Sequence, residues 1–457
     1  MKRLLATIIA LTMALGMTAC EGKDSSDSSA KDSSAIDSIV TDSSASDNSE
    51  SSEGDKQEGP LTIENGVVVA CDKNATGKVV IPEGVTEIGV NAFLKCQGIT
   101  NVELPESVTK IDNYAFSACE QLTDIYIPGS VETIGVKAFF GCKALKKVNM
   151  ADGIKKIDKN AFTLCTNLES VYIPDSVEEI GEGAFSSCKK LEEITIPNKV
   201  TAISAKTFAW CDSLDEVTIP EGITAIEEEA FMACISLAKI TIPDSVTEIG
   251  KNAFFRCYRI RSIDISANVT VIGDGAFAGC LWLDTINLAE DNQSFVYENG
   301  LLFNKDKTAL ICCLCESGER YYRVPENVTE IKAKAFYDNS VIAELTIPEG
   351  VTTIGAATFA YCPHLYKVVI PNTVTSIDAE AFEGCEVLSD IVIPDGVTSI
   401  GEQAFNGCNN LREITIPDSV TEIGKDAFYN CKDISVTYKG ETYTYDNIDE
   451  LYTTQED

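Results

Sequence analysis

The fold is decided by one stretch of the sequence, Leu122-Thr-Asp-Ile125-Tyr-Ile127-Pro128-Gly-Ser-Val131-Glu-Thr-Ile134-Gly135-Val-Lys-Ala138-Phe139-Phe-Gly-Cys142. Ile125 and Ile127 alternate with a polar position, which predicts a short β-strand. Pro128 ends this strand because proline has no N–H to donate to a ladder. Val131 and Ile134 form a second short apolar pair, and a glycine follows where the chain must turn tightly.

The same stretch recurs through most of the chain. Its last part, from Ala138 to Cys142, places apolar residues three apart and suits a short helical turn. The Ala-Phe or Thr-Phe pair returns every 23 residues in fourteen units, with the phenylalanines Phe93, Phe116, Phe139, Phe162, Phe185, Phe208, Phe231, Phe254, Phe277, Phe336, Phe359, Phe382, Phe405 and Phe428. No unit can bury its own apolar face, so we expect the units to stack around one continuous core.

Two Asn-Gly pairs divide the repeats into a nine-unit and a five-unit array. Asn65-Gly66 and Asn299-Gly300 each lie between apolar runs, which is typical of a β-hairpin. A third apolar pair of runs, 436–443, predicts a hairpin that caps the end of the chain. The predicted fold is therefore a β-rich repeat solenoid of leucine-rich-repeat type, with strands on one face and short helical turns or a second strand row opposite. It is built of two stacked arrays that each follow a hairpin.

The repeat consensus, L-x-x-I-x-I-P-x-x-V-T-x-I-G-x-x-A-F-x-x-C, resembles the BspA-like leucine-rich repeat family of bacterial surface proteins. The resemblance extends over residues 61–452. Departures are few: Ala151 and Ser266 replace the proline, and Asn339 replaces the cysteine. Members of this family are associated with attachment to host matrix proteins and to other cells, so the resemblance implies partners of that class.

The N-terminal sixty residues are expected to lie outside the fold. Lys2 and Arg3 precede a short apolar run, and Met17-Thr-Ala-Cys20 is similar to a bacterial lipobox, with methionine where leucine is usual. Residues 1–19 are therefore predicted to be a lipoprotein signal peptide and Cys20 the lipidated residue; an ordinary cleaved signal peptide is the alternative. Residues 20–60 are rich in Ser and Asp and predict a disordered tether.

These observations give the predicted organisation of the chain. The hairpin cap and the nine-repeat array occupy 61–288. The hairpin insertion and the five-repeat array occupy 289–433, and a C-terminal hairpin cap and tail occupy 434–457. The formal net charge of −35 disfavours nucleic acid as a partner. No other stretch is apolar and long enough to span a bilayer, so membrane contact is expected only through the lipid.

Thirteen cysteines occur three residues after a repeat phenylalanine. They predict either a column of buried thiols that pack as small hydrophobes, or a disulfide ladder or metal stack. Parallel side chains at stacked positions do not converge as a disulfide requires, which favours buried thiols. Cys312, Cys313 and Cys315 in the middle hairpin could bind a soft metal, but strand residues divided between two hairpin faces explain them better. We predict no metal and no cofactor.

Catalysis has little support in the sequence. His364 is the one histidine, and it follows Cys362, which belongs to the thiol column. A Cys–His pair needs an exposed thiol beside the imidazole, and no nucleophile-elbow motif accompanies a Ser–His–Asp alternative. We therefore expect no catalytic residues. An extracellular hydrolase remains a minor alternative, which a pocket gathering carboxylates near 289–320 would favour.

The positions that vary within the fixed repeat are the candidates for ligand binding. Tyr126, Asn149 and Tyr172 occupy the outward position of three successive strands, the two tyrosines about 10 Å apart. Tyrosine on an exposed sheet suits protein or sugar contacts. Two basic islands stand out in the acidic chain. One contains Lys146 and Lys147, and the other contains Arg256, Tyr258, Arg259 and Arg261. Strand preference and local charge balance are the simpler explanations.

The sequence thus predicts a monomeric, non-catalytic binding or adhesion module in the cell envelope, outside the cytoplasm and lipid-anchored to a bacterial membrane. Its expected partner is an extracellular protein, from host matrix or another cell surface, or a glycan. A structural spacer without a specific ligand is the alternative.

Overall fold

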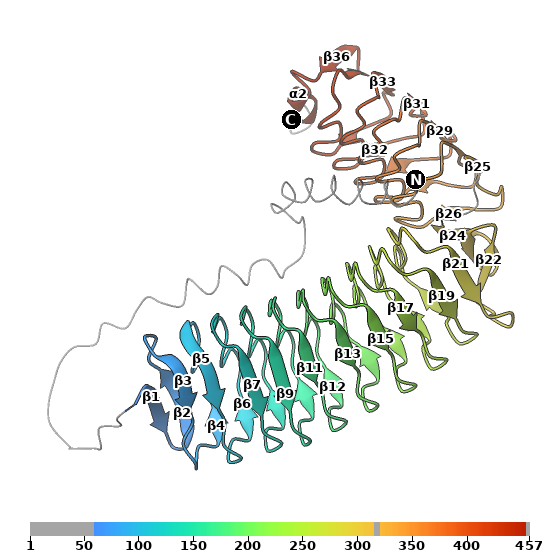
Figure 1. Cartoon of the computed structure of the whole chain (residues 1–457). Helices are drawn as coiled ribbons and strands as arrows, with labels where there is room; N and C mark the ends of the chain where they lie inside the picture. Colours follow the sequence, from blue (N-terminus) through green and yellow to red (C-terminus); the bar gives the residue numbers. More distant parts are fainter. Residues whose placement is uncertain (1–58, 315–319, 454–457) are drawn as a thin grey trace, which may run out of the picture. The chain divides into compact units, whose positions relative to one another are not determined.

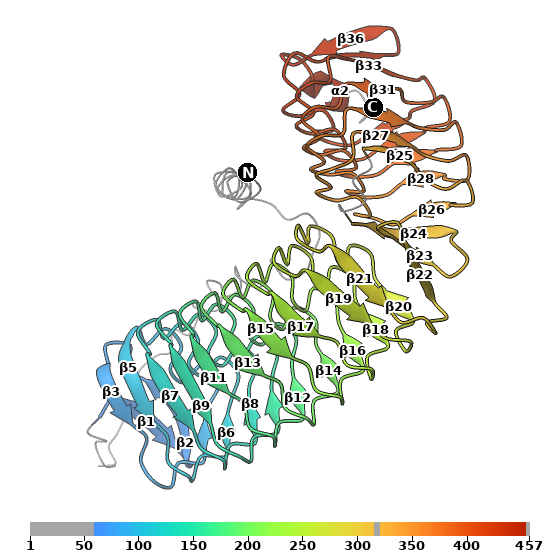
Figure 2. The same ribbon diagram turned by 45° about the vertical axis from the view of Figure 1, so that its right-hand side comes forward.

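The computed structural model describes residues 59–314 and 320–453. Two rows of short strands run side by side through the repeats, and each repeat contributes one strand to each row (Figures 1 and 2). The strand rows of a leucine-rich-repeat solenoid are therefore present, as the repeat consensus predicted. Among the residues that the structure describes, no helix has the length and apolar character needed to cross a bilayer.

The first row faces solvent with every second residue. Its strands are β3 (Thr76–Val80), β5 (Gly98–Glu103), β7 (Asp124–Ile127), β9 (Lys147–Met150), β11 (Ser170–Tyr172), β13 (Glu193–Thr195), β15 (Glu216–Thr218), β17 (Lys239–Thr241), β19 (Ser262–Ile265), β21 (Thr285–Leu288), β25 (Tyr321–Arg323), β27 (Glu344–Thr346), β29 (Lys367–Val369), β31 (Asp390–Ile391), β33 (Glu413–Ile416) and β35 (Ser435–Tyr438).

The second row consists of shorter strands, mostly of two residues. They are β2 (Val67–Cys71), β4 (Glu87–Ile88), β6 (Lys110–Ile111), β8 (Thr133–Ile134), β10 (Lys156–Ile157), β12 (Glu179–Ile180), β14 (Ala202–Ile203), β16 (Ala225–Ile226), β18 (Glu248–Ile249), β20 (Val271–Ile272), β24 (Ala309–Cys313), β26 (Glu330–Ile331), β28 (Thr353–Ile354), β30 (Ser376–Ile377), β32 (Ser399–Ile400) and β34 (Glu422–Ile423).

Pairing within each row is parallel and in register with the repeat. In the first row Ile125 lies opposite Val148, and in the second row Ile134 lies opposite Ile157, each pair 23 residues apart. Because the register equals the repeat length, equivalent side chains of successive layers lie directly above one another. Each inward apolar side chain therefore packs against the residue at the same repeat position in the next layer, which is apolar in most layers.

The third side of each layer differs from the short helical turn that the spacing suggested. Lys137 and Gly141, on either side of Phe139, have φ angles of 54° and 69°, which an α-helix does not allow. The Phe139 N–H donates to the carbonyl of Ala161 in the next layer, at 2.8 Å, rather than to a residue one turn earlier. The repeats thus bend through tight turns whose hydrogen bonds join layers. The one helix among the described residues is α2 (Asp449–Thr453).

Gly135 shows how closely the layers approach. A Cβ at this position would lie 2.7 Å from the backbone nitrogen of Asn113 and 2.7 Å from the carbonyl carbon of Asp112 in the preceding layer. Such a separation is shorter than any ordinary carbon contact. The glycine after the second strand is therefore needed for stacking as well as for turning.

The repeat phenylalanines stack face to face inside the solenoid. Successive rings from Phe93 to Phe277 have centroids 4.7–6.0 Å apart, and those from Phe336 to Phe428 have centroids 5.1–5.3 Å apart. Offset aromatic pairs at this distance add to the burial energy of each ring. The stacking of successive repeats that the 23-residue spacing predicted is thus confirmed.

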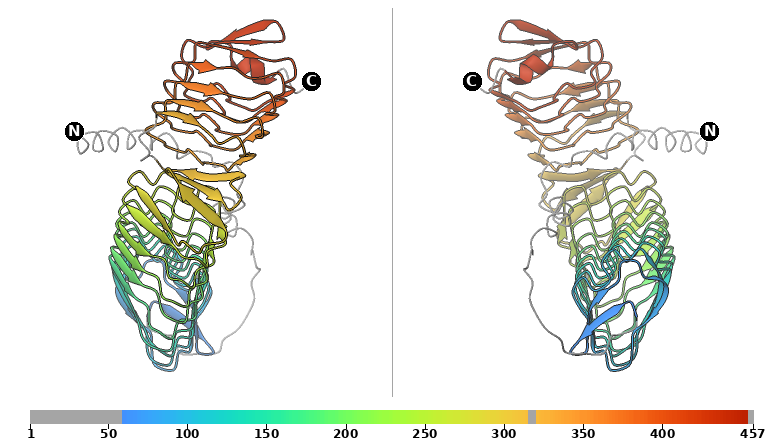
Figure 3. Two further views of the ribbon diagram at one scale, coloured as in Figure 1. Left: turned by 90° about the vertical axis from the view of Figure 1, so that its right-hand side faces the viewer. Right: turned by 90° about the vertical axis from the view of Figure 1, so that its left-hand side faces the viewer.

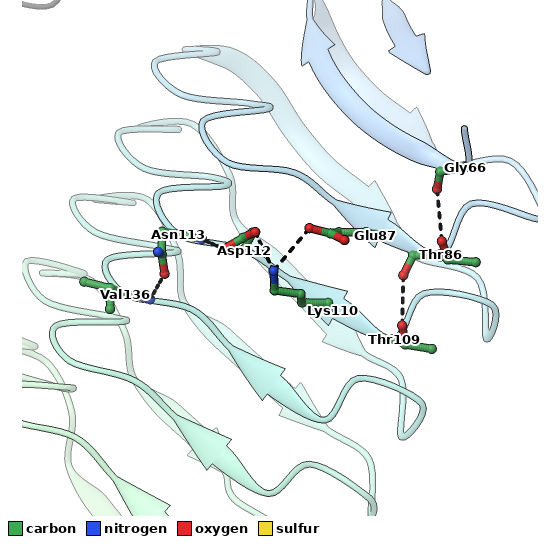
Figure 4. A network of polar contacts seen from close by, with 8 residues as sticks. All are labelled: Gly66, Thr86, Glu87, Thr109, Lys110, Asp112, Asn113 and Val136. Atoms are coloured by element: carbon green, nitrogen blue, oxygen red, sulfur yellow. Dashed lines mark hydrogen bonds and ion pairs between the residues drawn. The ribbon is translucent and has the colours of Figure 1, made fainter. Parts of the chain in front are cut away.

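Polar side chains repeat between layers as well. The Thr109 hydroxyl donates to the carbonyl of Thr86, and the Thr86 hydroxyl donates to that of Gly66, at 3.1 and 3.3 Å (Figure 4). On the second row the Lys110 ammonium bonds Glu87 of the preceding layer at 3.3 Å (Figure 4). Polar groups at the surface of each layer therefore find hydrogen-bond partners in the neighbouring layer, outside the apolar interior.

The core is divided in two by the middle hairpin, where the sequence suggested one continuous interior. Strands β22 (Phe295–Glu298) and β23 (Leu301–Asn304) pair antiparallel and lie between the two arrays (Figure 3). Phe295 and Leu302 pack into the core of the nine-repeat array, whereas Leu301 and Phe303 pack into that of the five-repeat array. Alternation along a strand sends neighbouring residues to opposite faces, so one hairpin covers an end of each core.

Hairpins also stand at the two ends of the described repeats. At the start, β1 (Leu61–Glu64) pairs antiparallel with β2, and at the end β35 pairs antiparallel with β36 (Glu441–Thr444), after which α2 buries Leu451. A hairpin precedes each array, as the Asn-Gly pairs predicted.

Candidate functional site

Tyr126, Asn149 and Tyr172 form a row across three neighbouring strands of the first row. Tyr126 lies opposite Asn149, and Asn149 lies opposite Tyr172, in the parallel register of β7, β9 and β11. The two tyrosines are 52% and 62% exposed. Two strand spacings, about 10 Å, separate them. We call these three residues the tyrosine row.

The first basic island lies beside the tyrosine row. Lys147 is in β9, two residues before Asn149, and therefore on the same face of the sheet. Lys146 immediately precedes this strand and is exposed. Lys143, in contrast, forms an ion pair with Glu120 at 2.8 Å. No ion pair joins Lys146 or Lys147 to another residue of the described ranges, so both ammonium groups are available to an acidic partner.

The second basic island does not remain together in the structure. Arg259 is exposed and lies 3.8 Å from a carboxylate oxygen of Asp215, and the guanidinium of Arg261 lies 5.0 Å from the ring centre of Trp282. Tyr258 is half-buried, and burial raises the pKa of its hydroxyl. Both exposed arginines, Arg259 and Arg261, thus already interact with side chains of this chain.

Arg256 points away from these residues and joins the two arrays. Its guanidinium donates a 2.6 Å hydrogen bond to the hydroxyl of Tyr337, 81 residues later. It also lies 5.2 Å from the ring centre of Phe255 and 5.7 Å from that of Tyr337. Lys334 donates to the side-chain oxygen of Asn252 at 3.0 Å across the same boundary. We call these five residues the junction cluster.

Burial has electrostatic consequences next to the junction cluster. Asp338 is almost fully buried, and this burial raises the pKa of its carboxyl to about 7 although the charge of Arg256 opposes the shift. Burial also lowers the pKa of the Lys334 ammonium. The boundary between the arrays therefore holds charged groups that are only partly compensated.

The junction cluster is the feature that sequence reasoning missed. Arg256 was grouped with its sequence neighbours, but its left-handed backbone, with φ of 59°, turns it to another side of the layer. Its partner Tyr337 lies beyond the middle hairpin and directly follows a repeat phenylalanine. An aromatic residue occupies this position in the layers on both sides of the hairpin, at Phe255 and Tyr337, but also in distant layers, at Phe140 and Tyr429, so the sequence alone did not single out the contact.

The cysteines of the repeat form a buried column with a uniform contact. Twelve thiols, from Cys119 to Cys280 and from Cys362 to Cys431, each donate to the carbonyl of the phenylalanine 26 residues earlier, at 3.0–3.3 Å. Burial raises the pKa of thiols such as Cys188 and Cys234. Cysteine at this position fills a small space and supplies a weak donor to a carbonyl.

The two described cysteines of the middle hairpin face different cores, and the histidine follows a buried thiol. Cys312 is buried in the core of the nine-repeat array, and Cys313 packs against that of the five-repeat array. Asn339, which replaces the repeat cysteine, donates its amide to the Cys313 sulfur at 3.4 Å. His364 is exposed, whereas Cys362 is buried and bonded to a backbone carbonyl. Cys20 and Cys315 lie outside the described residues.

Two shallow grooves lie beside the hairpin insertion. One, of 490 Å³, borders β21 and β22 and includes Glu290 and Lys305. The other, of 530 Å³, borders β25 and includes Glu298, Tyr321 and Arg323. Each groove has one carboxylate among its lining residues, and that of Glu298 is bonded to Lys307 at 2.7 Å. Neither therefore gathers the carboxylate pair that would favour a glycoside hydrolase.

Comparison with known proteins identifies leucine-rich repeats in this chain. The profile described as "BspA type Leucine rich repeat region" matches in six copies, over residues 70–192, 178–301 and 314–441. A leucine rich cell surface protein from Faecalibacterium prausnitzii is 30% identical, with a TM-score of 0.60 over 83% of this chain and 93% of its own. A leucine-rich repeat protein from Bacteroides ovatus is 24% identical, with a TM-score of 0.41 over 82% and 91%. No curated protein matches the sequence.

Proposed function

We propose that this protein, which belongs to the BspA-type leucine-rich repeat family, is a non-catalytic binding module at the cell surface. Its tyrosine row, with Lys146 and Lys147, meets an extracellular protein or a glycan. The relative from Faecalibacterium prausnitzii is described as a cell surface protein, which supports exposure at the surface. The tether and a lipid on Cys20 hold the repeats at a bacterial membrane.

The observation that carries this proposal is the exposure of two large aromatic side chains in register on the solvent face of a sheet. Tyr126 and Tyr172 stand in a column whose next members, Thr195 and Thr218, follow ordinary strand preference. Tyrosine gives a rigid apolar contact area together with a hydroxyl, and it is enriched in binding hot spots. A spacer without a ligand has no need of such an area on its solvent face.

Electrostatics supports the same face. The chain carries a formal charge of −35, yet Lys147 stands unpaired on the face that carries Asn149, and Lys146 stands unpaired beside it. Most lysines elsewhere are bonded to carboxylates of neighbouring layers, as Lys156 is to Glu179 at 3.0 Å. An unpaired cationic edge beside aromatic residues favours a partner with acidic groups and increases its rate of association.

A non-catalytic role fits the available side chains. Cys362, the cysteine nearest to His364 in sequence, is buried in the column and bonded to a backbone carbonyl, so it does not offer the exposed thiol that a Cys–His pair needs. Shallow grooves with one carboxylate each do not offer the enclosed site in which a substrate is held and water is excluded. A large flat face suits a macromolecule better than a small substrate.

The experiment is a binding assay with the full mature chain against matrix proteins, cell-wall glycans and host cells. The double variant Tyr126→Ala/Tyr172→Ala should weaken binding at least about tenfold, since hot-spot tyrosines contribute more than 1 kcal/mol each. Thr195→Ala/Thr218→Ala, in the next two layers of the same column, is the matched control and should bind normally. Equal binding by both double variants would refute the proposed face, and no binding to any partner would favour the spacer.

Lipid attachment is tested separately. Cells expressing the protein are grown with an alkyne-bearing fatty acid, and incorporation is measured after membrane fractionation. Wild-type protein should carry the label and sediment with membranes, whereas Cys20→Ser should be unlabelled. Labelling of the Cys20→Ser protein would contradict the assignment of this residue.

A further inference from the structure

The first cysteine of the column differs from the others. Every later thiol donates to a phenylalanine carbonyl 26 residues earlier, but Ala70 occupies that position for Cys96. The Cys96 sulfur instead lies 3.7 Å from the carbonyl oxygen of Cys71 and 3.9 Å from that of Asp72. These contacts are long, so the thiol is held less firmly than its equivalents.

A second thiol and a cation meet Cys96 at this end of the array. Cys71 ends strand β2, and its sulfur lies 3.7 Å from the carbonyl oxygen of Asp72. The Cys96 sulfur lies 3.9 Å from the same oxygen. The Lys73 ammonium lies 3.9 Å from the Cys96 sulfur and also bonds the carbonyl of Leu94. Lys73 is the only cation that the structure records within hydrogen-bonding distance of a column thiol in the described residues.

Cys71 and Cys96 are also related differently from neighbours in the column. Column thiols repeat every 23 residues and project in parallel, so a bridge between them would need side chains that converge. Cys71 belongs to the hairpin strand β2, 25 residues before Cys96, and so does not occupy a column position. The parallel projection that prevents a bridge between column thiols therefore does not apply to this pair.

The electrostatic environment favours ionisation of Cys96. The hydrogen bond from Cys71 lowers the pKa of Cys96, and the charge of Lys73 acts in the same direction against burial. For Cys188 and Cys234, burial dominates and raises the pKa. Since the thiolate is the reacting form, the two kinds of site should differ in reactivity.

We propose that Cys71 and Cys96 form a redox site that oxidised small-molecule or protein disulfides convert to an intramolecular disulfide, closing the N-terminal hairpin onto the first repeat. The Cys96 thiolate attacks the oxidant's disulfide, forming a mixed disulfide and releasing one thiolate. The Cys71 thiol loses its proton, attacks the Cys96 sulfur and releases the second thiolate. Two protein thiols are oxidised, and the oxidant is reduced to two thiols that take up the two protons.

Access to this site comes from the end of the array. The Cys71 and Cys96 side chains are covered in the closed state, so attack requires the first hairpin to open. Terminal layers have one neighbour instead of two, and they open at lower free energy than internal layers. The turn Asp72–Asn74 next to the pair is exposed. Once formed, the disulfide would hold this end closed, which suits a chain predicted to work outside the reducing cytosol.

The test uses the full mature chain, fully reduced and folded, treated with glutathione disulfide and analysed by mass spectrometry of individual cysteine peptides. A peptide pair linked through Cys71 and Cys96 should appear first, while Cys119 and Cys234 stay reduced. Lys73→Met should slow the reaction at least about fivefold because less thiolate is present. Lys95→Met removes a neighbouring exposed lysine with no recorded contact to either sulfur and should react like wild type.

A second variant separates the two chemical steps. Cys71→Ser should stop at a glutathione adduct on Cys96, since the resolving thiol is gone. Oxidation of Cys96 no faster than that of Cys234 would overturn the proposal. So would glutathione adducts on both Cys71 and Cys96 of the wild-type chain without any link between them.

Discussion

Replacing the buried carboxyl of Asp338 by an amide should stabilise the protein at neutral and alkaline pH. Asp338 follows Phe336 by two residues and has a φ of 56°, a conformation that asparagine adopts readily. Its side chain is almost fully buried, and only the charge of Arg256 favours the ionised form. Asp338→Asn therefore removes a poorly solvated charge and changes neither the size of the side chain nor the backbone.

The magnitude follows from the pKa of this carboxyl. Burial raises the pKa of Asp338 from its ordinary 3.8 to about 7 in the folded protein. The folded state thus binds the proton more tightly than the unfolded state does. The contribution of this carboxyl to the unfolding free energy of the wild type is therefore greatest below pH 3.8. Its stability then falls as pH rises to 7, by about 1.4 kcal/mol per pH unit and about 4 kcal/mol in total. Asp338→Asn has no such loss.

The assay is urea unfolding of wild type and Asp338→Asn at a series of pH values from 3.5 to 8.5. The difference in unfolding free energy should be nearly constant below pH 4, grow in favour of the variant up to pH 7, and level off above it. Asp395→Asn, an exposed carboxyl of the same array, should give a constant small difference. A difference for Asp338→Asn that does not change with pH would refute the reasoning.

Three further substitutions test the packing. Phe162→Ala removes one ring from the stack and should lower the unfolding free energy by about 3–5 kcal/mol in urea titrations; a loss below 1 kcal/mol would contradict a tightly packed interior. Arg256→Ala removes the bond to Tyr337 and should destabilise by about 1.5–3 kcal/mol, whereas exposed Arg259→Ala should stay within about 0.5 kcal/mol. Gly135→Ala places a Cβ against the backbone of the preceding layer and should lower the midpoint of thermal unfolding. An unchanged midpoint would contradict the need for glycine at this position.

The repeat spacing determines most of this fold. A constant interval of 23 residues fixes a parallel register, and the register in turn stacks the phenylalanines, as Phe139 and Phe162 do at 5.0 Å. Asn-Gly pairs likewise indicated the hairpins before each array, because only a few residue pairs fit such tight turns. These features depend on local chemistry repeated many times and are visible in a single sequence.

Other features depend on contacts between distant segments and could not be obtained in this way. The third side of the layer is a turn and not a helix because hydrogen bonds such as Phe139 to Ala161 run between layers. The interior is divided because Leu301 and Leu302 face opposite cores, which requires knowing what lies on both sides of the hairpin. Arg256 bonds Tyr337, 81 residues later, and the repeat period does not predict that contact.

Radical footprinting of the bound protein tests the proposed binding face most directly. Tyr126 and Tyr172, together with Tyr321 and Tyr429 elsewhere on the surface, are all at least 51% exposed in the free chain. Hydroxyl radicals should therefore modify all four before the partner is added. Once the partner is bound, modification of Tyr126 and Tyr172 should fall several-fold while Tyr321 and Tyr429 remain reactive. Protection of Tyr321 or Tyr429 alone would contradict the proposed binding face.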